Sequence, residues 1–206
     1  MICGMSITAL RTNQLFEFIK GMTIKPDIWV IYIDNNPKKD LDIKNRYMRI
    51  TNNYNLVKKV VPDCSDYVFI LEDDCTPPVD IVERLYNTMS KDESVDCVTT
   101  ACYQRMLGNN DHLEDDLMVY NIEIRKPHMM IHHHTDRSGL KKVDATSFNC
   151  MMFKKKVLDT TNFMGDSYFM THDMNFFLQC KLLKYNVLCD YSIPTKHNNA
   201  KDWNGV

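Results

Sequence analysis

Short apolar runs of strand-forming residues alternate with helical segments along this chain of 206 residues. The clearest runs are Tyr67–Leu71 and Ile28–Ile33, which contain only aromatic and aliphatic side chains. Between such runs, apolar residues recur every three to four positions, as at Leu15, Ile19 and Met22, which is the spacing of a helix with one buried face. Alternating strands and helices are typical of a fold in which crossover helices cover a sheet. The sequence therefore predicts an α/β protein.

The same criteria predict the remaining elements. Strands are expected at 2–8, 28–33, 67–71, 95–101, 117–124, 143–153 and 187–191. Helices are expected up to about Gly21, in the polar segment that ends near Val61, from Pro77-Pro78 to about Met89, and from about Thr171 to Tyr185. The segments 108–116 and 128–139 are expected to be irregular. Because no repeat, linker or low-complexity segment interrupts this pattern, residues 1–206 are expected to form a single domain.

Composition and charge argue against several classes of protein. Hydrophobic residues make up 44% of the chain and charged residues 25%, as in ordinary globular proteins. The net charge of -2 means that the chain as a whole lacks the excess positive charge typical of proteins that bind nucleic acid or a membrane surface. The densest basic cluster, 154–156, is interpreted as the solvated start of a helix. No run approaches the roughly 20 apolar residues of a membrane span, and the first residues lack the pattern of a signal peptide.

The eight cysteines occur singly, and no two of them form a C-x-x-C pair. Several lie inside apolar runs, as Cys97 and Cys189 do. This pattern indicates reduced, buried thiols rather than a disulfide framework or a zinc site. It favours a cytoplasmic location.

Three consecutive carboxylates, Glu72, Asp73 and Asp74, directly follow the clearest strand. In open α/β sheets, ligands bind at the carboxyl ends of the strands. In an extended segment the first and third of these side chains point to one side and the second to the other. Two carboxylates can therefore share a hard divalent cation, which prefers oxygen ligands. Such a cation can bridge a diphosphate and offset the charge that develops as the diphosphate leaves.

Two other interpretations of the acidic triplet are open. It can be a solvated turn before a helix, where carboxylates interact favourably with the helix dipole. Positions 72, 74 and 76 also mimic the D-x-D-x-T loop of haloacid-dehalogenase-type phosphatases. That chemistry needs an aspartate nucleophile at the first position, and the longer side chain of Glu72 would misplace the attacking oxygen. The phosphatase is therefore disfavoured.

Taken together, five stretches resemble family-2-type glycosyltransferases of the GT-A fold, over nearly the whole chain. In that family one strand ends in an aspartate that contacts the nucleotide base, and another ends in the D-x-D metal motif. A further strand lines the acceptor site, a helix begins with an E-D motif, and a closing strand precedes a metal-binding histidine. The matching stretches are, in this order, 28–35, 67–74, 144–158, His172-Asp173 and 185–197. The resemblance implies a GT-A type, Rossmann-like, mixed and mostly parallel sheet flanked by helices.

The chain departs from the family pattern at two of these positions. Glu72 stands at the first position of the D-x-D motif, and His172 replaces the glutamate of the E-D motif. There is also no Q-x-x-R-W motif, which argues against a processive polysaccharide synthase. The resemblance therefore implies a non-processive enzyme.

The activity implied by the resemblance is metal-dependent, inverting transfer of a sugar from a UDP- or GDP-linked donor to an acceptor hydroxyl. Mn²⁺ or Mg²⁺ would serve as the cofactor. The metal ligands would be Glu72, Asp74 and His197, whose imidazole can complete the shell of a divalent cation. The donor contacts would be Thr8, Arg11, Asp34, Glu72 and Asp73. A glycan, a protein or a hydroxylated nucleic-acid base are all candidate acceptors.

Asp173 is the candidate general base, because inverting transfer needs a group that takes the proton of the attacking hydroxyl. Its alternative role is that of an acid in the first turn of a helix. The histidines 132–134 cannot easily converge on one metal, so a loop is expected there. Trp203 either stacks on a sugar or packs the tail.

Two further functions compete with the transferase. A nucleotidyltransferase shares the sheet and the acidic metal site, but such enzymes usually carry a glycine-rich loop after the first strand, and residues 7–12 contain no glycine. A catalytically silent nucleotide-sugar-binding module would keep the fold and Asp34 but would not need Asp173.

Overall fold

The computed structural model describes residues 1–8, 11–34, 43–102, 117–125, 128–165 and 170–197. The predicted loop at 108–116 and Trp203 lie outside these residues. Within the described residues, no helix is both long and apolar enough to cross a membrane.

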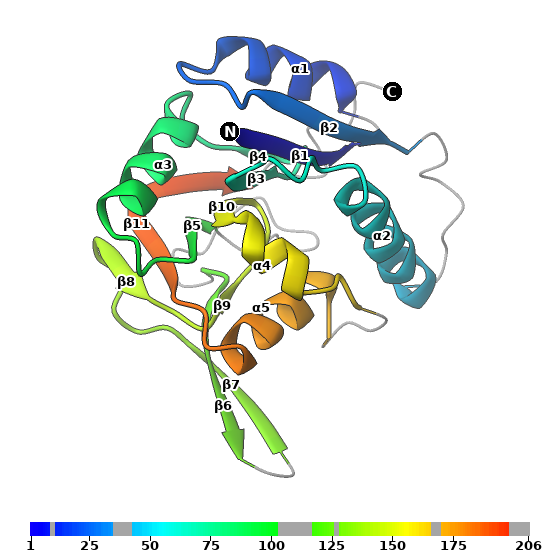
Figure 1. The fold of residues 1–206 in the computed structure, drawn as a ribbon. Coiled ribbons are helices and arrows are strands. Elements are labelled where there is room, and N and C mark those ends of the chain that lie inside the picture. Colours follow the sequence, from blue (N-terminus) through cyan, green and yellow to red (C-terminus); the bar gives the residue numbers. More distant parts are fainter. Residues whose placement is uncertain (9–10, 35–42, 103–116, 126–127, 166–169, 198–206) are drawn as a thin grey trace.

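An eight-stranded mixed sheet forms the centre of the fold (Figure 1). Seven strands lie side by side in the order β2, β1, β3, β10, β5, β11, β4, and β8 pairs with β11 outside this path. Strands β1, β2, β3, β5 and β11 are parallel to one another, whereas β10, β8 and β4 run antiparallel to their neighbours. The bounds are Ile2–Thr8 (β1), Ile28–Ile33 (β2), Tyr67–Leu71 (β3), Cys75–Thr76 (β4), Cys97–Cys102 (β5), Leu140–Lys142 (β8), Cys150–Lys154 (β10) and Val187–His197 (β11).

Helices cover both faces of this sheet, which is why its central strands are apolar along their whole length. Side chains alternate between the faces along β3. Val68 and Ile70 pack with α2, α4 and α5, whereas Phe69 and Leu71 pack with α1 and α3. The bounds are Thr12–Gly21 (α1), Ile43–Lys58 (α2), Ile81–Lys91 (α3), Lys155–Thr160 (α4) and His172–Leu182 (α5). The predicted α/β fold, with a mixed and mostly parallel sheet flanked by helices, is confirmed.

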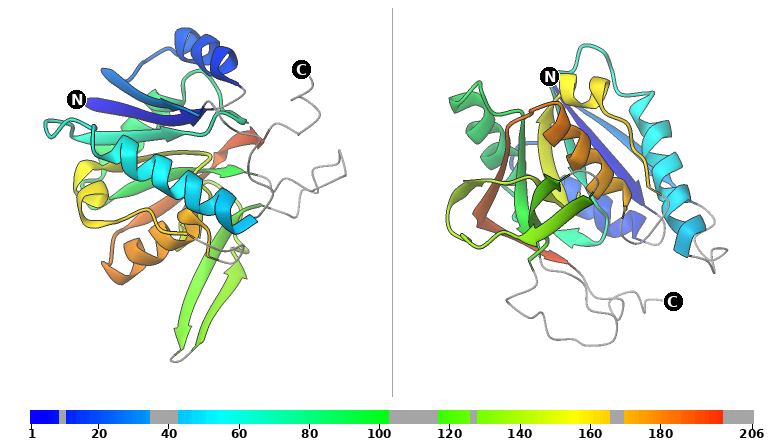
Figure 2. Two further views of the ribbon diagram at one scale, coloured as in Figure 1. Left: turned by 90° about the vertical axis from the view of Figure 1, so that its right-hand side faces the viewer. Right: turned by 90° about the horizontal axis from the view of Figure 1, so that it is seen from below.

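A second, three-stranded sheet consists of β6 (Val119–Arg125), β7 (His128–His133) and β9 (Ala145–Thr146). Strands β6 and β7 form an antiparallel hairpin that extends away from the large sheet (Figures 1 and 2). The prediction of irregular structure from 128 is therefore wrong as far as His133. The strand pairs with β6, which precedes it directly, from Tyr120 opposite His133 to Arg125 opposite His128. The methionines and histidines of 128–133 are not among the residues that favour strands strongly, so composition did not reveal it.

Two predicted strands have different bounds in the structure. The predicted strand 143–153 is divided, because β9 pairs with β6 of the small sheet and β10 pairs with β3 and β5 of the large one. The predicted strand 187–191 continues to His197, because its pairing with β5 resumes after a register shift between Asp190 and Pro194.

The predicted helix at Pro77-Pro78 begins later, at Ile81. The carbonyl of Pro78 accepts a turn hydrogen bond from Ile81, and the short strand β4 occupies the preceding positions. The acidic triplet is therefore not in the first turn of a helix. At the basic cluster 154–156, α4 begins at Lys155 as predicted, and Lys156 forms an ion pair of 2.6 Å with Asp96.

No disulfide links any of the eight cysteines, all of which lie in the described part of the chain, and seven of them are buried. The prediction of buried thiols is confirmed for Cys97 and Cys189, which are fully buried in the core.

Candidate functional site

The carboxyl ends of three neighbouring parallel strands meet at one edge of the large sheet. Asp34, after β2, donates its backbone N–H to the carbonyl of Thr8 at the end of β1, at 2.7 Å. The hydroxyl of Thr8 donates to Oδ2 of Asp73, after β3, also at 2.7 Å. Three of the residues predicted to contact the donor therefore lie side by side, as expected for the ligand-binding edge of an α/β sheet.

A tight turn follows β3 and gathers possible metal ligands. The backbone N–H of Cys75 donates to the carbonyl of Glu72 at 3.2 Å, which folds the segment back on itself. One ligand atom each from Glu72, Asp74 and Cys75 then lies within 4.8 Å of the others. The two carboxylates offer hard oxygen ligands and the thiol a softer sulfur. These three side chains can together hold a divalent cation, and two of them were predicted to do so.

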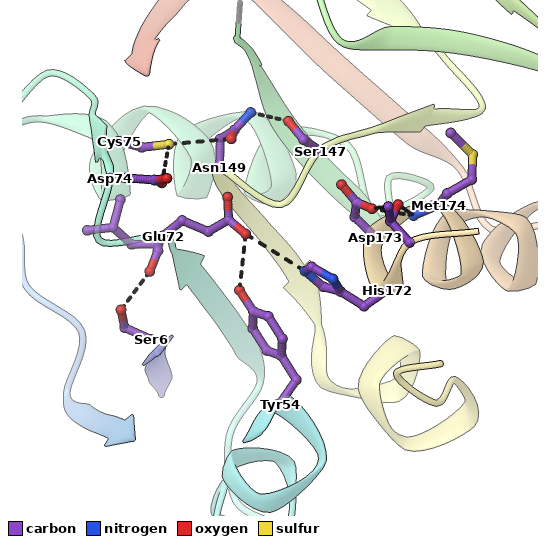
Figure 3. A network of polar contacts seen from close by, with 12 residues as sticks. Ser6, Tyr54, Glu72, Asp74, Cys75, Ser147, Asn149, His172, Asp173 and Met174 are labelled. Atoms are coloured by element: carbon purple, nitrogen blue, oxygen red, sulfur yellow. Dashed lines mark hydrogen bonds and ion pairs between the residues drawn. The ribbon is translucent and has the colours of Figure 1, made fainter. Parts of the chain in front are cut away.

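The Cys75 side chain is buried behind this turn. Its Sγ lies 3.5 Å from Oδ1 of Asp74 and 3.4 Å from Oδ1 of Asn149, whose amide in turn donates to Ser147 (Figure 3). Burial, with a contact to Cys102 second, raises the pKa of the Cys75 thiol well above its ordinary value. The thiol therefore keeps its single proton, which it can donate to either of these oxygens, and metal binding would displace that proton.

A cavity of about 300 Å³ adjoins the acidic turn. Its walls include Glu72, Asp73 and Cys75 on one side and the start of α1 on the other. Arg11 lines it and is buried, with 4% of its surface exposed. Arg11 is therefore not a solvent-facing side chain. A buried guanidinium beside a candidate cation site is well suited to an anionic ligand such as a diphosphate.

Glu72 is enclosed by aromatic side chains on the opposite side from Asp74 (Figure 3). The Tyr54 hydroxyl, from α2, lies 3.5 Å from Oε1 of Glu72, and Nε2 of His172, from α5, lies 3.9 Å from the same oxygen. Burial raises the pKa of the Glu72 carboxyl above its ordinary value, and the charge of Asp74 adds to this effect. His172 opposes the shift by stabilising the ionised form.

The Tyr54 phenol is close enough to four of the five predicted carboxylates to be affected by their charges. Burial raises the pKa of its hydroxyl well above the ordinary value, and nearby negative charges raise it further. These charges belong to Glu72, Asp173, Asp74 and Asp73. The candidate base on α5 and the acidic turn after β3, about a hundred residues apart in sequence, therefore both lie on the side of the sheet where Tyr54 is buried.

Asp173 lies in the first turn of α5. Its Oδ1 accepts a hydrogen bond of 2.8 Å from the backbone N–H of Met174 and another from the hydroxyl of Thr171, the N-cap residue. Asp173 therefore does contribute to the helix start, as its alternative role requires. Within the described chain no donor contacts Oδ2, so the second carboxylate oxygen can still accept a proton.

Asp34 and His197 were also predicted as site residues, but the structure supports their roles less directly. Asp34 forms an ion pair of 2.9 Å with Arg49 and lies 3.5 Å from the amide of Asn53, so its carboxylate is already bound to α2. His197 pairs with Cys75 through the backbone of β11 and β4. Its backbone is therefore beside the acidic turn, while its side chain lies outside what the structure describes.

Sequence reasoning missed three residues of this site: Cys75, Tyr54 and Asn149. Cys75 directly follows the acidic triplet, and that adjacency was a usable signal. Tyr54 lies on a polar helix, and Asn149 lies just before β10. Neither has a local pattern that distinguishes it, because both reach the site through tertiary packing.

No family model and no curated protein matches this chain. Among solved structures, the crystal structure of A197 from STIV is similar to it, with 15% sequence identity and a TM-score of 0.58. The similarity covers 96% of this chain and 85% of that one. At this level of identity the similarity shows a shared fold alone, and a fold does not define a function.

Proposed function

We propose that this protein is a metal-dependent glycosyltransferase of the GT-A fold, which transfers a sugar from a UDP- or GDP-linked donor to an acceptor hydroxyl. The observation that carries the proposal is the acidic turn after β3. Ligand atoms of Glu72, Asp74 and Cys75 lie within 4.8 Å of one another there, and the turn borders a cavity lined by the buried Arg11. A cation and a buried guanidinium at one cavity form a pair of positive charges suited to a diphosphate.

The remaining residues take roles consistent with this chemistry. Thr8 and Asp73 hydrogen-bond to each other at the strand ends, where the donor would bind. Asp34 would contact the base or ribose, in competition with its ion pair to Arg49. Asp173 would take the acceptor proton through its Oδ2 as the acceptor oxygen attacks the anomeric carbon. His197, on the strand beside Cys75, would complete the metal shell, with Mn²⁺ or Mg²⁺ as the expected cation.

A silent nucleotide-sugar-binding module is the second candidate, and one observation favours it. Oδ1 of Asp173 caps α5, so this residue has a structural role even without catalysis. Hydrolysis of a panel of UDP- and GDP-sugars, with and without manganese, separates the two functions. The transferase is expected to hydrolyse its donor slowly in a manganese-dependent way, whereas the module only binds it.

The direct test of the cation site is Asp74→Ala, with Asp159→Ala as a matched control. Asp159 is an exposed carboxylate that forms an ion pair with Lys155 on α4. A ligand at a hundredfold excess over its dissociation constant stabilises a protein by about 2.7 kcal/mol, or roughly 5 to 10 °C for a chain of this size. We expect manganese with UDP or GDP to give this shift in the wild type and in Asp159→Ala, but not in Asp74→Ala. An equal shift in all three proteins would remove the acidic turn from the proposal.

A further inference from the structure

His172 is a buried imidazole whose polar atoms are not satisfied within the described chain. Only 7% of its surface is exposed, and neither ring nitrogen forms a hydrogen bond with a described residue. Buried polar groups are nearly always hydrogen-bonded, so each exception calls for a physical explanation. The ring is also held in place, because Tyr54 stacks on it at 5.2 Å and Phe148 meets it edge-on at 5.3 Å between ring centroids.

This fixed imidazole faces the candidate cation site. Its Nε2 is 3.9 Å from Oε1 of Glu72, and the Tyr54 hydroxyl is 3.5 Å from the same oxygen. Figure 3 shows Glu72 between two sets of partners, with Asp74 and Cys75 on one side and Tyr54 and His172 on the other. The two polar groups therefore approach one carboxylate oxygen from α2 and α5, and the acidic turn lies beyond the other oxygen.

We propose that Tyr54 and His172 are positioning residues, which hold Oε1 of Glu72 and thereby present its second oxygen to the cation. This inference rests on the proposed function, because it assigns a role toward the cation of the same site. Carboxylates that bind metals are themselves hydrogen-bonded, and such outer partners set the orientation of the ligand. Both contacts are long, and we expect them to shorten once a cation fixes the carboxylate.

The length of the Glu72 side chain explains why positioning residues are useful here. Glutamate has one more rotatable bond than the aspartate of a D-x-D motif, so its carboxylate can occupy more positions. Two donors on rigid helices remove that freedom before the cation arrives, and preorganisation of this kind raises affinity. His172 is also the chain neighbour of Asp173, so the same helix start fixes the cation ligand and carries the candidate base.

The test is a titration with Mn²⁺ alone, in which electron paramagnetic resonance measures the free ion. Tyr54→Phe removes only the hydroxyl, and His172→Phe removes both nitrogens while keeping a ring that can stack. We expect each variant to bind manganese about tenfold more weakly, or worse, as outer-partner mutations typically do. His172→Gln keeps a donor and should recover part of the affinity. Phe177→Leu is the packing control, because Phe177 packs against Phe148 and Phe176 in the same core.

The outcomes separate this inference from the proposed function. Weaker manganese binding by Tyr54→Phe and His172→Phe, with wild-type binding by the less stable Phe177→Leu, supports the positioning role. Wild-type affinity in both test variants, together with loss of binding in Glu72→Gln, overturns the positioning role and leaves the cation site intact. Equal weakening in Phe177→Leu shows a general packing effect and also overturns it. If the wild type binds no manganese, the cation site itself is wrong and both proposals fail.

Discussion

Histidines occur in two contrasting regions of this molecule. His172 is buried between aromatic rings and faces the carboxylate of Glu72, whereas His132 and His133 are exposed on the outer strand of the β6–β7 hairpin. The hairpin histidines are the more conspicuous in sequence, because they are part of a run of three. His132 and His172 each lie 3.9 Å from a glutamate, but only His172 is buried. Burial beside a charged group makes an imidazole a candidate for a functional role, whereas an exposed pair of this kind is weak.

The largest expected effect is on the free energy of unfolding, which substitutions in the aromatic core should lower much more than substitutions in the hairpin. Phe148 is fully buried and contacts Tyr54, His172 and three other aromatic rings. We expect Phe148→Ala to lower the free energy of unfolding by about 3 to 5 kcal/mol. Met130, on the hairpin, is 41% exposed, so Met130→Ala should change it by about 0.5 kcal/mol or less. Denaturant unfolding measures both values. Similar losses for the two variants would show that the hairpin is as tightly packed as the core.

The next largest effect concerns turnover. A general base acts in the transition state, so its removal lowers the rate without weakening donor binding. We expect Asp173→Asn to slow transfer at least about 100-fold, while asparagine Oδ1 still accepts the hydrogen bond from Met174 that Asp173 accepts at 2.8 Å. The control is Asp136→Asn, beyond the hairpin, which should transfer at the wild-type rate. Near-normal turnover of Asp173→Asn, or a product with retained anomeric configuration, would mean that another group is the base.

A smaller effect should appear in the pH dependence of stability. The pKa of Glu72 is raised in the folded protein, first by burial and then by Asp74. Its protonated form is therefore favoured by folding, and this stabilisation is present in acid and is lost as the pH rises through the raised pKa. Without metal, Glu72→Gln should thus melt at a higher temperature than the wild type at pH 7. The two proteins should converge below the ordinary glutamate pKa of about 4.3. If the difference in melting temperature between Glu72→Gln and the wild type is the same at every pH, the effect comes from packing and not from the ionisation of Glu72.

The part of the site that lies on one continuous segment was predictable. The apolar run of β3 and the carboxylates after it are adjacent, so the strand, its buried faces and the position of Glu72 and Asp74 at the sheet edge followed from local pattern. The convergence of Asp173 with them did not follow from local pattern. It was expected only from the order of the motifs, and in the structure the chain neighbour of Asp173, His172, lies 3.9 Å from Oε1 of Glu72.

The missing parts of the prediction have more than one physical cause. The aromatic enclosure of Glu72 is built from α2, from the segment before β10 and from α5, so no window of sequence contains it. The hairpin was missed for a different reason: β7 follows β6 directly, but its methionines and histidines do not favour a strand strongly. The helix after Pro77-Pro78 was placed too early because a turn ending at Ile81 precedes it. Local propensity predicts most of the elements, and long-range contacts decide which residues they enclose.

The smallest effect should come from the hairpin histidines. Position 132 lies opposite Asn121 and position 133 opposite Tyr120 in the hairpin, and both imidazoles are exposed. The contact of His132 with Glu123 is 3.9 Å long, and such exposed pairs contribute little to stability.

A double variant, His132→Ala with His133→Ala, should therefore have a free energy of unfolding within about 0.5 kcal/mol of the wild type. It should also bind manganese with unchanged affinity. An exposed hairpin can also contact an acceptor, so acceptor saturation should be measured as well. A raised KM for the acceptor with unchanged metal affinity would show that the hairpin takes part in acceptor binding. Weaker manganese binding would instead break the contrast between the two regions, because it would mean that exposed imidazoles supply ligands to the cation.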